Sequence, residues 1–242
     1  QEVVTCEYQY DNGICNKCGN SKYLVFELLS DGTYSVTGYK NSPNELVIPS
    51  TYMGKSVTSI GEDAFMNCKN LTSITMPDSV KAIDKGAFYG CSGLASIELP
   101  ESLTTISAFA FTSCISLMNI TIPENVTTIG DSAFISCSSL ISIKLPNNLT
   151  TIGSDVFAYC TSLTSIELPE SLTTIDSFAF YSCSGLTSIE LPESLTTISV
   201  FAFYNCSSLT SITIPNGVKS ILSYTFSGCS SLTSITIPDS VT

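Results

Sequence analysis

Cysteine residues recur every 23 positions along most of this chain, without one insertion. They stand at Cys68, Cys91, Cys114, Cys137, Cys160, Cys183, Cys206 and Cys229. Each is followed by leucine at the third position, isoleucine at the sixth and proline at the ninth, and all but the last by phenylalanine at the twentieth. Identical units of this length cannot bury their apolar side chains alone, so the period predicts a solenoid of stacked coils.

The order of residues within one copy predicts a single turn of such a coil. Ile166 and Leu168 are two positions apart, the spacing of inward side chains on a short strand. Pro169 lacks the amide hydrogen that a continuing ladder needs, so the chain turns there. A second extended run at residues 172–175 and a short helical turn around residues 179–180 complete the unit.

The repeat resembles that of BspA-like, or Treponema-type, leucine-rich repeat proteins, whose copies read close to L-x-x-I-x-L-P-x-x-V-x-x-I-x-x-x-A-F-x-x-C. The likeness covers residues 56–242, with single departures at Met76, Val156 and Thr225. The resemblance implies a right-handed leucine-rich-repeat superhelix with parallel β-strands and short helical turns. It also implies a secreted or surface-displayed protein that binds host or microbial proteins, because members of the family are typically of this kind.

The period divides the chain into two expected regions. Residues 1–49 lack it and should form an N-terminal cap with a cysteine knuckle and a β-hairpin, whereas residues 50–242 form the solenoid, truncated within a repeat. In the cap, residues 23–29 and 33–39 read as two strands joined by an Asp31-Gly32 turn. Such a hairpin would cover the open edge of the first coil.

Three cysteines of the cap lie outside the repeat. Cys15 and Cys18 form a C-x-x-C knuckle of the kind found in zinc sites, and Cys6 lies upstream. A closed zinc site takes four cysteine or histidine ligands, and the chain contains no histidine. The count favours one disulfide with a leftover thiol over zinc, so we expect no bound metal.

The charge balance argues against several classes of partner. The chain carries 21 acids and 9 bases, a net charge of −12, and every base is lysine. Phosphate recognition depends on clustered lysine and arginine, so we expect no nucleic-acid partner. No apolar run approaches the roughly 18 residues that cross a bilayer, so we expect no membrane insertion of this segment.

The groups used in catalysis are scarce. Without histidine there is no Ser-His or Cys-His pair, and no glycine-rich phosphate loop or helical metal motif occurs. Paired glutamates could cleave glycosides, but a shallow repeat surface lacks a cleft that excludes water. We therefore expect no enzyme activity, no catalytic residue and no cofactor.

The outward side chains of the first strand form the first candidate binding surface. They gather in two polar columns, and curved solenoids commonly bind partners with this surface. Serine and threonine can equally serve to keep a sheet soluble, since such small side chains offer few anchors. The candidate residues are Ser142, Lys144, Ser165, Glu167, Ser188, Glu190, Ser211 and Thr213.

An aromatic patch on the helical turn is the alternative surface. Its two columns are three residues apart and would share a face in stacked coils. Aromatic residues are enriched at interface cores, but they also pack against one another as an outer layer, which we favour here. The patch comprises Phe178, Tyr181, Phe201, Tyr204 and Tyr224.

Two further clusters have simpler explanations. The eight repeat cysteines could form a redox or metal array, but a column of small buried residues is ordinarily packing, with thiols bonded to loop carbonyls. Four carboxylates at Glu167, Glu170, Glu190 and Glu193 could attract calcium, yet no Asp-rich loop or glycine turn accompanies them. We expect buried free thiols and a solvated acidic patch.

These expectations describe an extracellular or cell-surface protein-binding module, with adhesion or host–microbe interaction through the solenoid surface. The functional part depends on the family resemblance, which leaves the protein ligand unidentified. A passive spacer in a larger surface protein and a glycan-binding module are the alternatives. A spacer would have no saturable ligand, and a glycan binder would give specific signals on a glycan array.

Overall fold

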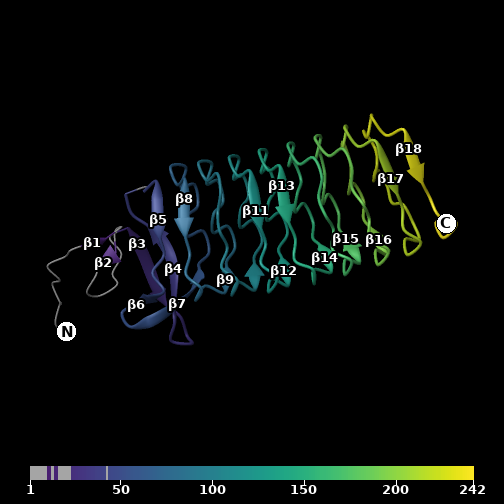
Figure 1. Ribbon diagram of the computed structural model, residues 1–242. Helices are drawn as coiled ribbons and strands as arrows, with labels where there is room; N and C mark the ends of the chain where they lie inside the picture. Colours follow the sequence, from purple (N-terminus) through teal and green to yellow (C-terminus); the bar gives the residue numbers. More distant parts are fainter. Residues whose placement is uncertain (1–9, 12–13, 16–22, 42) are drawn as a thin grey trace.

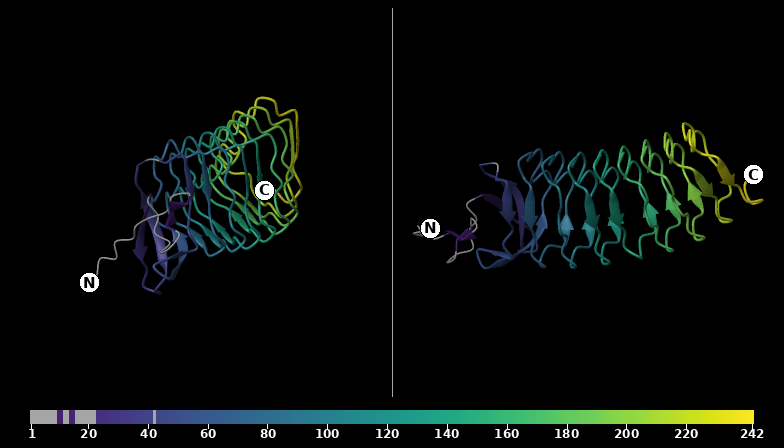
Figure 2. Two further views of the ribbon diagram at one scale, coloured as in Figure 1. Left: turned by 60° about the vertical axis from the view of Figure 1, so that its left-hand side comes forward. Right: turned by 45° about the horizontal axis from the view of Figure 1, so that its top comes forward.

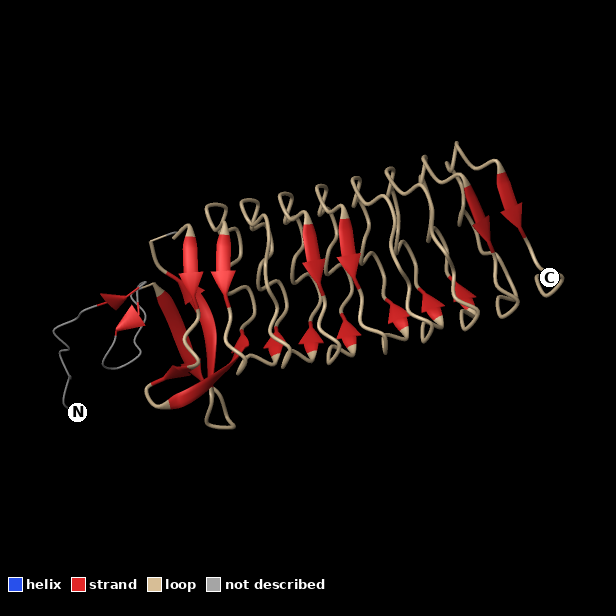
Figure 3. Ribbon diagram, viewed as in Figure 1, coloured by secondary structure: helices blue, strands red, loops and turns tan. Residues whose placement is uncertain are grey.

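In the computed structural model, which describes residues 10–11, 14–15, 23–41 and 43–242, the chain forms a right-handed solenoid (Figure 1). Successive coils lie side by side from the cap to the C-terminal end (Figure 2). Short strands lie on two opposite faces, and loops and turns make up the rest of each coil (Figure 3). Each residue therefore has its main neighbours in the coils before and after its own.

The first face, called the strand face below, carries the strands that follow each repeat cysteine. They pair in parallel, β5 with β8, β11 with β13 and β17 with β18. The same face continues through residues 96–98, 165–167 and 188–190, which form no named strand. Its strands are β5 (Glu45–Val47), β8 (Ser73–Thr75), β11 (Asn119–Thr121), β13 (Ser142–Lys144), β17 (Ser211–Thr213) and β18 (Ser234–Thr236).

The second face, called the threonine face below, consists of two-residue strands that end in a buried isoleucine. In all of them but β9, the residue before this isoleucine is a threonine. β14 to β16 form a three-stranded sheet, whereas β9, β10 and β12 continue a sheet that begins in the cap. The strands are β9 (Ala82–Ile83), β10 (Thr105–Ile106), β12 (Thr128–Ile129), β14 (Thr151–Ile152), β15 (Thr174–Ile175) and β16 (Thr197–Ile198).

The parallel pairings place each residue opposite its equivalent in the next coil. Ile120 faces Ile143 between β11 and β13, and Ile152 faces Ile175 between β14 and β15. These partners are 23 residues apart, so the sequence period is the length of one coil. The solenoid predicted from the repeat is confirmed.

The first coil is longer because it contains an additional hairpin. β6 (Thr51–Tyr52) pairs antiparallel with the start of β7 (Lys55–Ile60). Met53 and Gly54 form the turn with φ of 49° and 76°, as in the primed turns that match strand twist. β5 contributes to the strand face although it precedes residue 50, where the sequence-based division starts the solenoid.

The predicted cap hairpin is confirmed. β3 (Leu24–Leu28) pairs antiparallel with β4 (Tyr34–Tyr39), and Gly32 in the connecting turn has φ of 85°. Asp31 Oδ1 accepts hydrogen bonds from the amide and hydroxyl of Thr33 at 2.9 and 2.7 Å. β4 also pairs in parallel with β7, so the hairpin covers the edge of the first coil.

A column of stacked phenylalanine rings runs through the core. Neighbouring rings from Phe65 to Phe226 have centroid distances of 5.3–5.9 Å. Tyr39 of the cap stacks on Phe65 at 5.9 Å, which continues the column into β4. The cap and the solenoid thus share one apolar core.

The repeat cysteines form a second buried column. From Cys91 to Cys229, each thiol donates a hydrogen bond to the carbonyl of a phenylalanine in the preceding coil at 3.1–3.3 Å. All eight are free and buried. Burial raises the pKa of the Cys137 and Cys160 thiols well above the usual value. The prediction of buried thiols bonded to loop carbonyls is confirmed.

The predicted short helical turns are wrong. No α-helix occurs in the described residues, and the Ala179-Phe180 segment belongs to a run of turns over residues 177–182. Phe178 and Ser182 adopt φ of 61° and 56°, which a right-handed helix does not allow. Within the part of the chain that the structure describes, no helix could therefore cross a bilayer.

The cysteine knuckle of the cap falls outside the described residues. Cys6 and Cys18 are not described, and Cys15 is described only by its backbone in β2 (Ile14–Cys15). This strand pairs antiparallel with β1 (Tyr10–Asp11). The choice between a disulfide and zinc at this knuckle stays a prediction.

Candidate binding surface

All eight candidate residues of the strand face are exposed, and they fall into two groups. Four lie in paired strands, namely Ser142 and Lys144 in β13 and Ser211 and Thr213 in β17. Four lie in two adjacent coils that form no strand on this face, namely Ser165, Glu167, Ser188 and Glu190. The strand face is therefore not uniform along the solenoid.

Glutamate on the strand face marks the coils in which the ladder is interrupted. Where the ladder is intact, the Ile122 amide donates to the Lys144 carbonyl of the next coil at 2.9 Å. Among the coils that a further coil follows, the equivalent amides that donate to no described residue each lie in a glutamate coil or in the coil before one, and they are those of Met76, Leu99, Leu145, Leu168 and Leu191. The coils without a strand on this face, apart from an isolated bridge at Ser96, are those of Glu98, Glu167 and Glu190.

Side-chain chemistry accounts for this interruption. Glutamate is depleted in strands, whereas the threonines at the equivalent positions of β8, β11 and β17 are favoured there. Glu167 and Glu190 also occupy equivalent positions in adjacent coils, and like charges facing each other destabilise strand pairing. Lys144 in the paired strand β13 instead forms an ion pair with Glu124 at 3.9 Å. The positions of the Glu-Leu-Pro-Glu segments thus determine where the parallel strand pairing of the strand face is interrupted.

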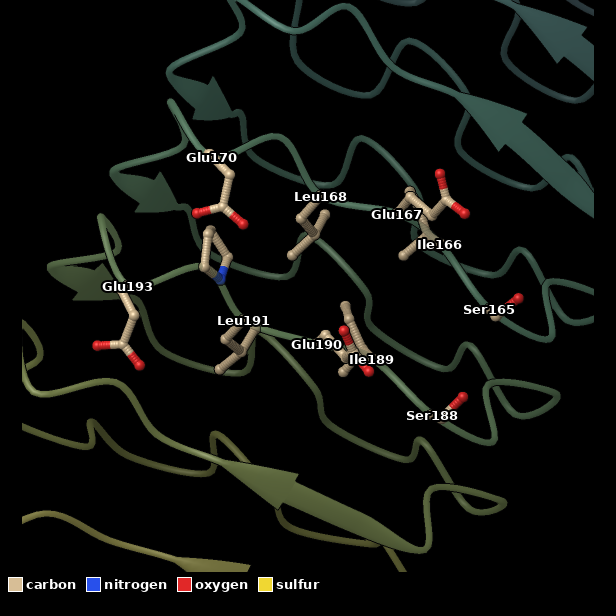
Figure 4. A pocket seen from close by; sticks show the side chains of 11 residues that line it. Ser165, Ile166, Glu167, Leu168, Glu170, Ser188, Ile189, Glu190, Leu191 and Glu193 are labelled. Carbon is tan, nitrogen blue, oxygen red and sulfur yellow. The ribbon is translucent and has the colours of Figure 1, made fainter.

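The two adjacent glutamate coils enclose a hollow of about 510 Å³ on the strand face (Figure 4). Leu168 and Leu191 lie in the middle of the hollow, and pairs of glutamates lie on either side of them (Figure 4). The pair on one side is Glu167 with Glu190, and the pair on the other is Glu170 with Glu193. The hollow has an apolar centre and an acidic rim.

The leucines at the centre correct the expectation that Leu168 lies in the core. Equivalent side chains in other coils are buried, with exposures of 1% for Ile122 and 2% for Ile214. Leu168 and Leu191 are only half-buried and pack against the margin of the core. The Glu-Leu-Pro-Glu segments were visible in the sequence, but only their glutamates were identified as surface residues.

A third Glu-Leu-Pro-Glu segment gives a second hollow. Glu98, Leu99 and Glu101 line a space of about 350 Å³ together with Asn119 and Thr121 of the next coil. Leu99 is half-buried, like Leu168 and Leu191. The Glu-Leu-Pro-Glu sequence is therefore associated with a hollow in two separate parts of the strand face.

The acidic rim of the larger hollow is not neutralised by the protein. The ion pairs among the described residues are Lys85 with Glu62 and Lys144 with Glu124, and neither involves the rim. Within the same residues, no group of three or more acidic, cysteine or histidine side chains could hold a metal ion. The rim therefore offers negative charge without the arrangement of a metal site.

The alternative aromatic patch is continuous on the turn edge of the solenoid. Phe178, Phe201 and Tyr224 stack at 4.9 Å, and Tyr181 stacks on Tyr204 at the same distance. The two columns also contact each other, at 5.7 Å between Phe178 and Tyr181. Ring faces cover ring faces within each column, and the rings of the two columns meet at a tilt, as in an outer packing layer.

Two features of this patch were not predicted from the sequence: Tyr159 as a further member, and the positive φ of Phe178, Phe201 and Tyr224. Tyr159 contacts Tyr181 edge-on at 5.3 Å but occupies a different column of the repeat. Phe178, Phe201 and Tyr224 have φ of 59–61°, a region that costs bulky residues roughly 1–2 kcal/mol each. Stacking between the rings offsets part of this cost.

Comparisons with known proteins agree with the repeat and the fold. The family model of the BspA type leucine rich repeat region matches residues 44–163 and 150–242, in 6 copies. No curated protein matches the chain significantly.

Three crystal structures illustrate the structural likeness. A leucine-rich repeat protein from Bacteroides ovatus is 32% identical over 90% of this chain and 76% of its own, with a TM-score of 0.64. The Treponema pallidum leucine rich repeat protein is 29% identical over 92% of this chain and 84% of its own, with a TM-score of 0.51. The pneumococcal vaccine antigen PcpA is 20% identical over 90% of this chain and 69% of its own, with a TM-score of 0.62. At this identity the likeness supports the fold alone. The chain therefore belongs to the BspA-type leucine-rich repeat family.

Proposed function

We propose that this solenoid is a protein-binding module of a secreted or cell-surface protein, and that its strand face meets the partner. Leucine-rich repeats of this kind are generally binding scaffolds without catalytic activity. Adhesion, or another contact between host and microbe, is the role that we propose for the binding. The hollow of about 510 Å³ in the strand face carries the proposal, because it combines two half-buried leucines with four carboxylates.

The charge of the molecule supports a protein partner over a nucleic acid. The net charge is −12, and after Lys85 the only bases are Lys144 and Lys219. A surface of this kind repels polyphosphates and attracts basic protein surfaces. The aromatic patch remains the second candidate surface, because Tyr224 in it is exposed and aromatic residues are enriched at interface cores.

The test compares substitutions on the two faces of the same solenoid. Ser142→Arg, Ser165→Arg and Ser211→Arg together place three bulky cations on the strand face. Thr128→Arg, Thr151→Arg and Thr197→Arg make the matched change on the threonine face. All six positions are exposed, so both variants should keep the circular dichroism spectrum and melting temperature of the parent.

The parent and both variants are screened on arrays of extracellular proteins and of glycans, and each hit is titrated. The proposal expects a saturable protein ligand whose Kd rises at least tenfold in the strand-face variant and little in the threonine-face variant. Absence of any saturable ligand would support a passive spacer. Specific signals on the glycan array alone would support a glycan-binding module, and equal losses in both variants would exclude the strand face.

A further inference from the structure

We infer that the hollow between the two adjacent glutamate coils docks an extended, arginine-bearing segment of the partner protein. The segment would present a cation, an apolar side chain and a second cation at alternate positions. This inference rests on the proposed function and adds the chemistry of the partner to it. Two properties of the hollow support this inference, namely its apolar centre and its acidic rim.

The centre of the hollow supplies apolar surface that the fold leaves uncovered. Leu168 and Leu191 are half-buried, whereas Ile122 and Ile214 at the same position of other coils are 1% and 2% exposed. Covering an exposed leucine stabilises a complex in proportion to the apolar area removed from water. One apolar side chain of a partner, set between the two leucines, would achieve this.

The rim supplies charge that the chain does not balance. Glu167, Glu170, Glu190 and Glu193 line the hollow, and none of them forms an ion pair with a described residue. Lys144, the base in the nearest repeat before the hollow, is already paired with Glu124. A guanidinium matches a carboxylate with two parallel hydrogen bonds, so arginine suits this rim better than lysine.

The arrangement of rim and centre sets the order of side chains in the segment. In each coil a glutamate precedes the leucine and another follows the proline, so carboxylates lie on both sides of the apolar centre (Figure 4). Alternate side chains of an extended segment point to the same side. Arginine, an apolar residue and arginine at alternate positions therefore match the hollow.

The second hollow on the strand face offers a comparison within the same chain. The hollow beside Glu98 has one Glu-Leu-Pro-Glu coil only, which contributes Glu98, Leu99 and Glu101 to its lining. It should therefore bind the same segment more weakly than the hollow between the two adjacent glutamate coils.

Fluorescein-labelled heptapeptides test this inference by anisotropy titration of the whole 242-residue chain. The probe has the sequence Gly-Arg-Ser-Leu-Ser-Arg-Gly. One control peptide replaces both arginines by glutamate, and the other replaces leucine by serine. The inference expects saturable binding of the probe, at least tenfold weaker binding without the arginines and at least threefold weaker binding without the leucine.

A pair of matched variants separates the hollow from the net charge. Glu167→Gln with Glu190→Gln removes two charges from the rim, and Glu27→Gln with Glu45→Gln removes two exposed charges from β3 and β5. The rim variant should weaken probe binding at least fivefold and the distant variant less than twofold. Equal weakening would show attraction by net charge alone and overturn the inference.

Failure of this inference is distinguishable from failure of the proposed function. If the probe does not bind, while the strand-face arginine variant still loses its protein ligand, the docking chemistry is wrong and the binding face stands. If the probe binds at the rim but the protein ligand is unaffected by the strand-face variant, the hollow binds arginine peptides and the proposed function falls.

Discussion

Each repeat cysteine occupies a position that suits a small, weakly polar side chain. Cys137 is fully buried, and its thiol donates to the Phe111 carbonyl at 3.2 Å. The same carbonyl accepts from the Cys114 amide at 3.2 Å, so the thiol adds a second hydrogen bond to it. Packing and this hydrogen bond account for the column.

The buried thiols should resist alkylation in the native protein. The thiolate is the nucleophile, and burial raises the pKa of Cys137, Cys160 and Cys183, so the reactive form is depleted at pH 8. With iodoacetamide and no reductant, mass spectrometry should find these residues unmodified until urea unfolds the chain. Cys229, which is 9% exposed, should react before them. Native-state labelling of Cys160 at the rate of a free thiol would contradict this.

At single positions, the sequence predicted the inward side chains well except where the ladder fails. Phe157 and Ile166 are buried as their columns indicate, with exposures of 0% and 6%. Leu168 follows the same pattern but is half-buried, whereas Leu145 at the equivalent position of the preceding coil is 5% exposed. The pattern of apolar residues is the same in both coils, so the centre of the hollow could not be predicted from it.

At the scale of elements, one residue decides whether a coil contributes a strand to this face. Ser-Ile-Thr and Ser-Ile-Lys form strands at β8, β17 and β13, whereas Ser-Ile-Glu forms none. The turn edge shows a similar limit, since the Ala-Phe pair favoured a helical turn from sequence. Positive φ at two positions of each turn excludes a helix. Gly86 and Gly90 at these positions were a signal in the sequence, whereas Phe178 at the first of them gave none.

Replacing the facing glutamates should restore the ladder. In Glu167→Thr with Glu190→Thr, two like charges are removed and two residues that favour strands are introduced. We expect the free energy of unfolding to rise by about 1 kcal/mol, measured by urea denaturation, and the arginine probe to lose its site.

The reverse change provides the control for this prediction. Thr213→Glu introduces a glutamate into β17, which pairs with β18 in the parent. It should lower stability by about 0.5–1 kcal/mol. Stabilisation by Thr213→Glu, or destabilisation by the double threonine variant, would refute the role assigned to glutamate.

Over the whole molecule, the equal length of the coils brings like residues into register along the axis. This register stacks the phenylalanines and aligns the cysteines, and both columns could be read from the 23-residue period. It also brings Glu167 next to Glu190, so a repeated segment becomes a hollow only because two copies adjoin. The strand face is therefore acidic and unpaired in the coils of Glu167 and Glu190. At β11 and β13 it is instead paired, and Lys144 there forms an ion pair with Glu124.

Amide hydrogen exchange resolved to single residues tests this account most directly. The amides of Ile122 and Ile214 bond to the next coil at 2.9 Å, whereas those of Leu168 and Leu191 have no partner among the described residues. In the native protein, Leu168 and Leu191 should exchange at least tenfold faster than Ile122 and Ile214. Equal protection at all four amides would mean that the ladder is continuous and that the strand face has no such opening.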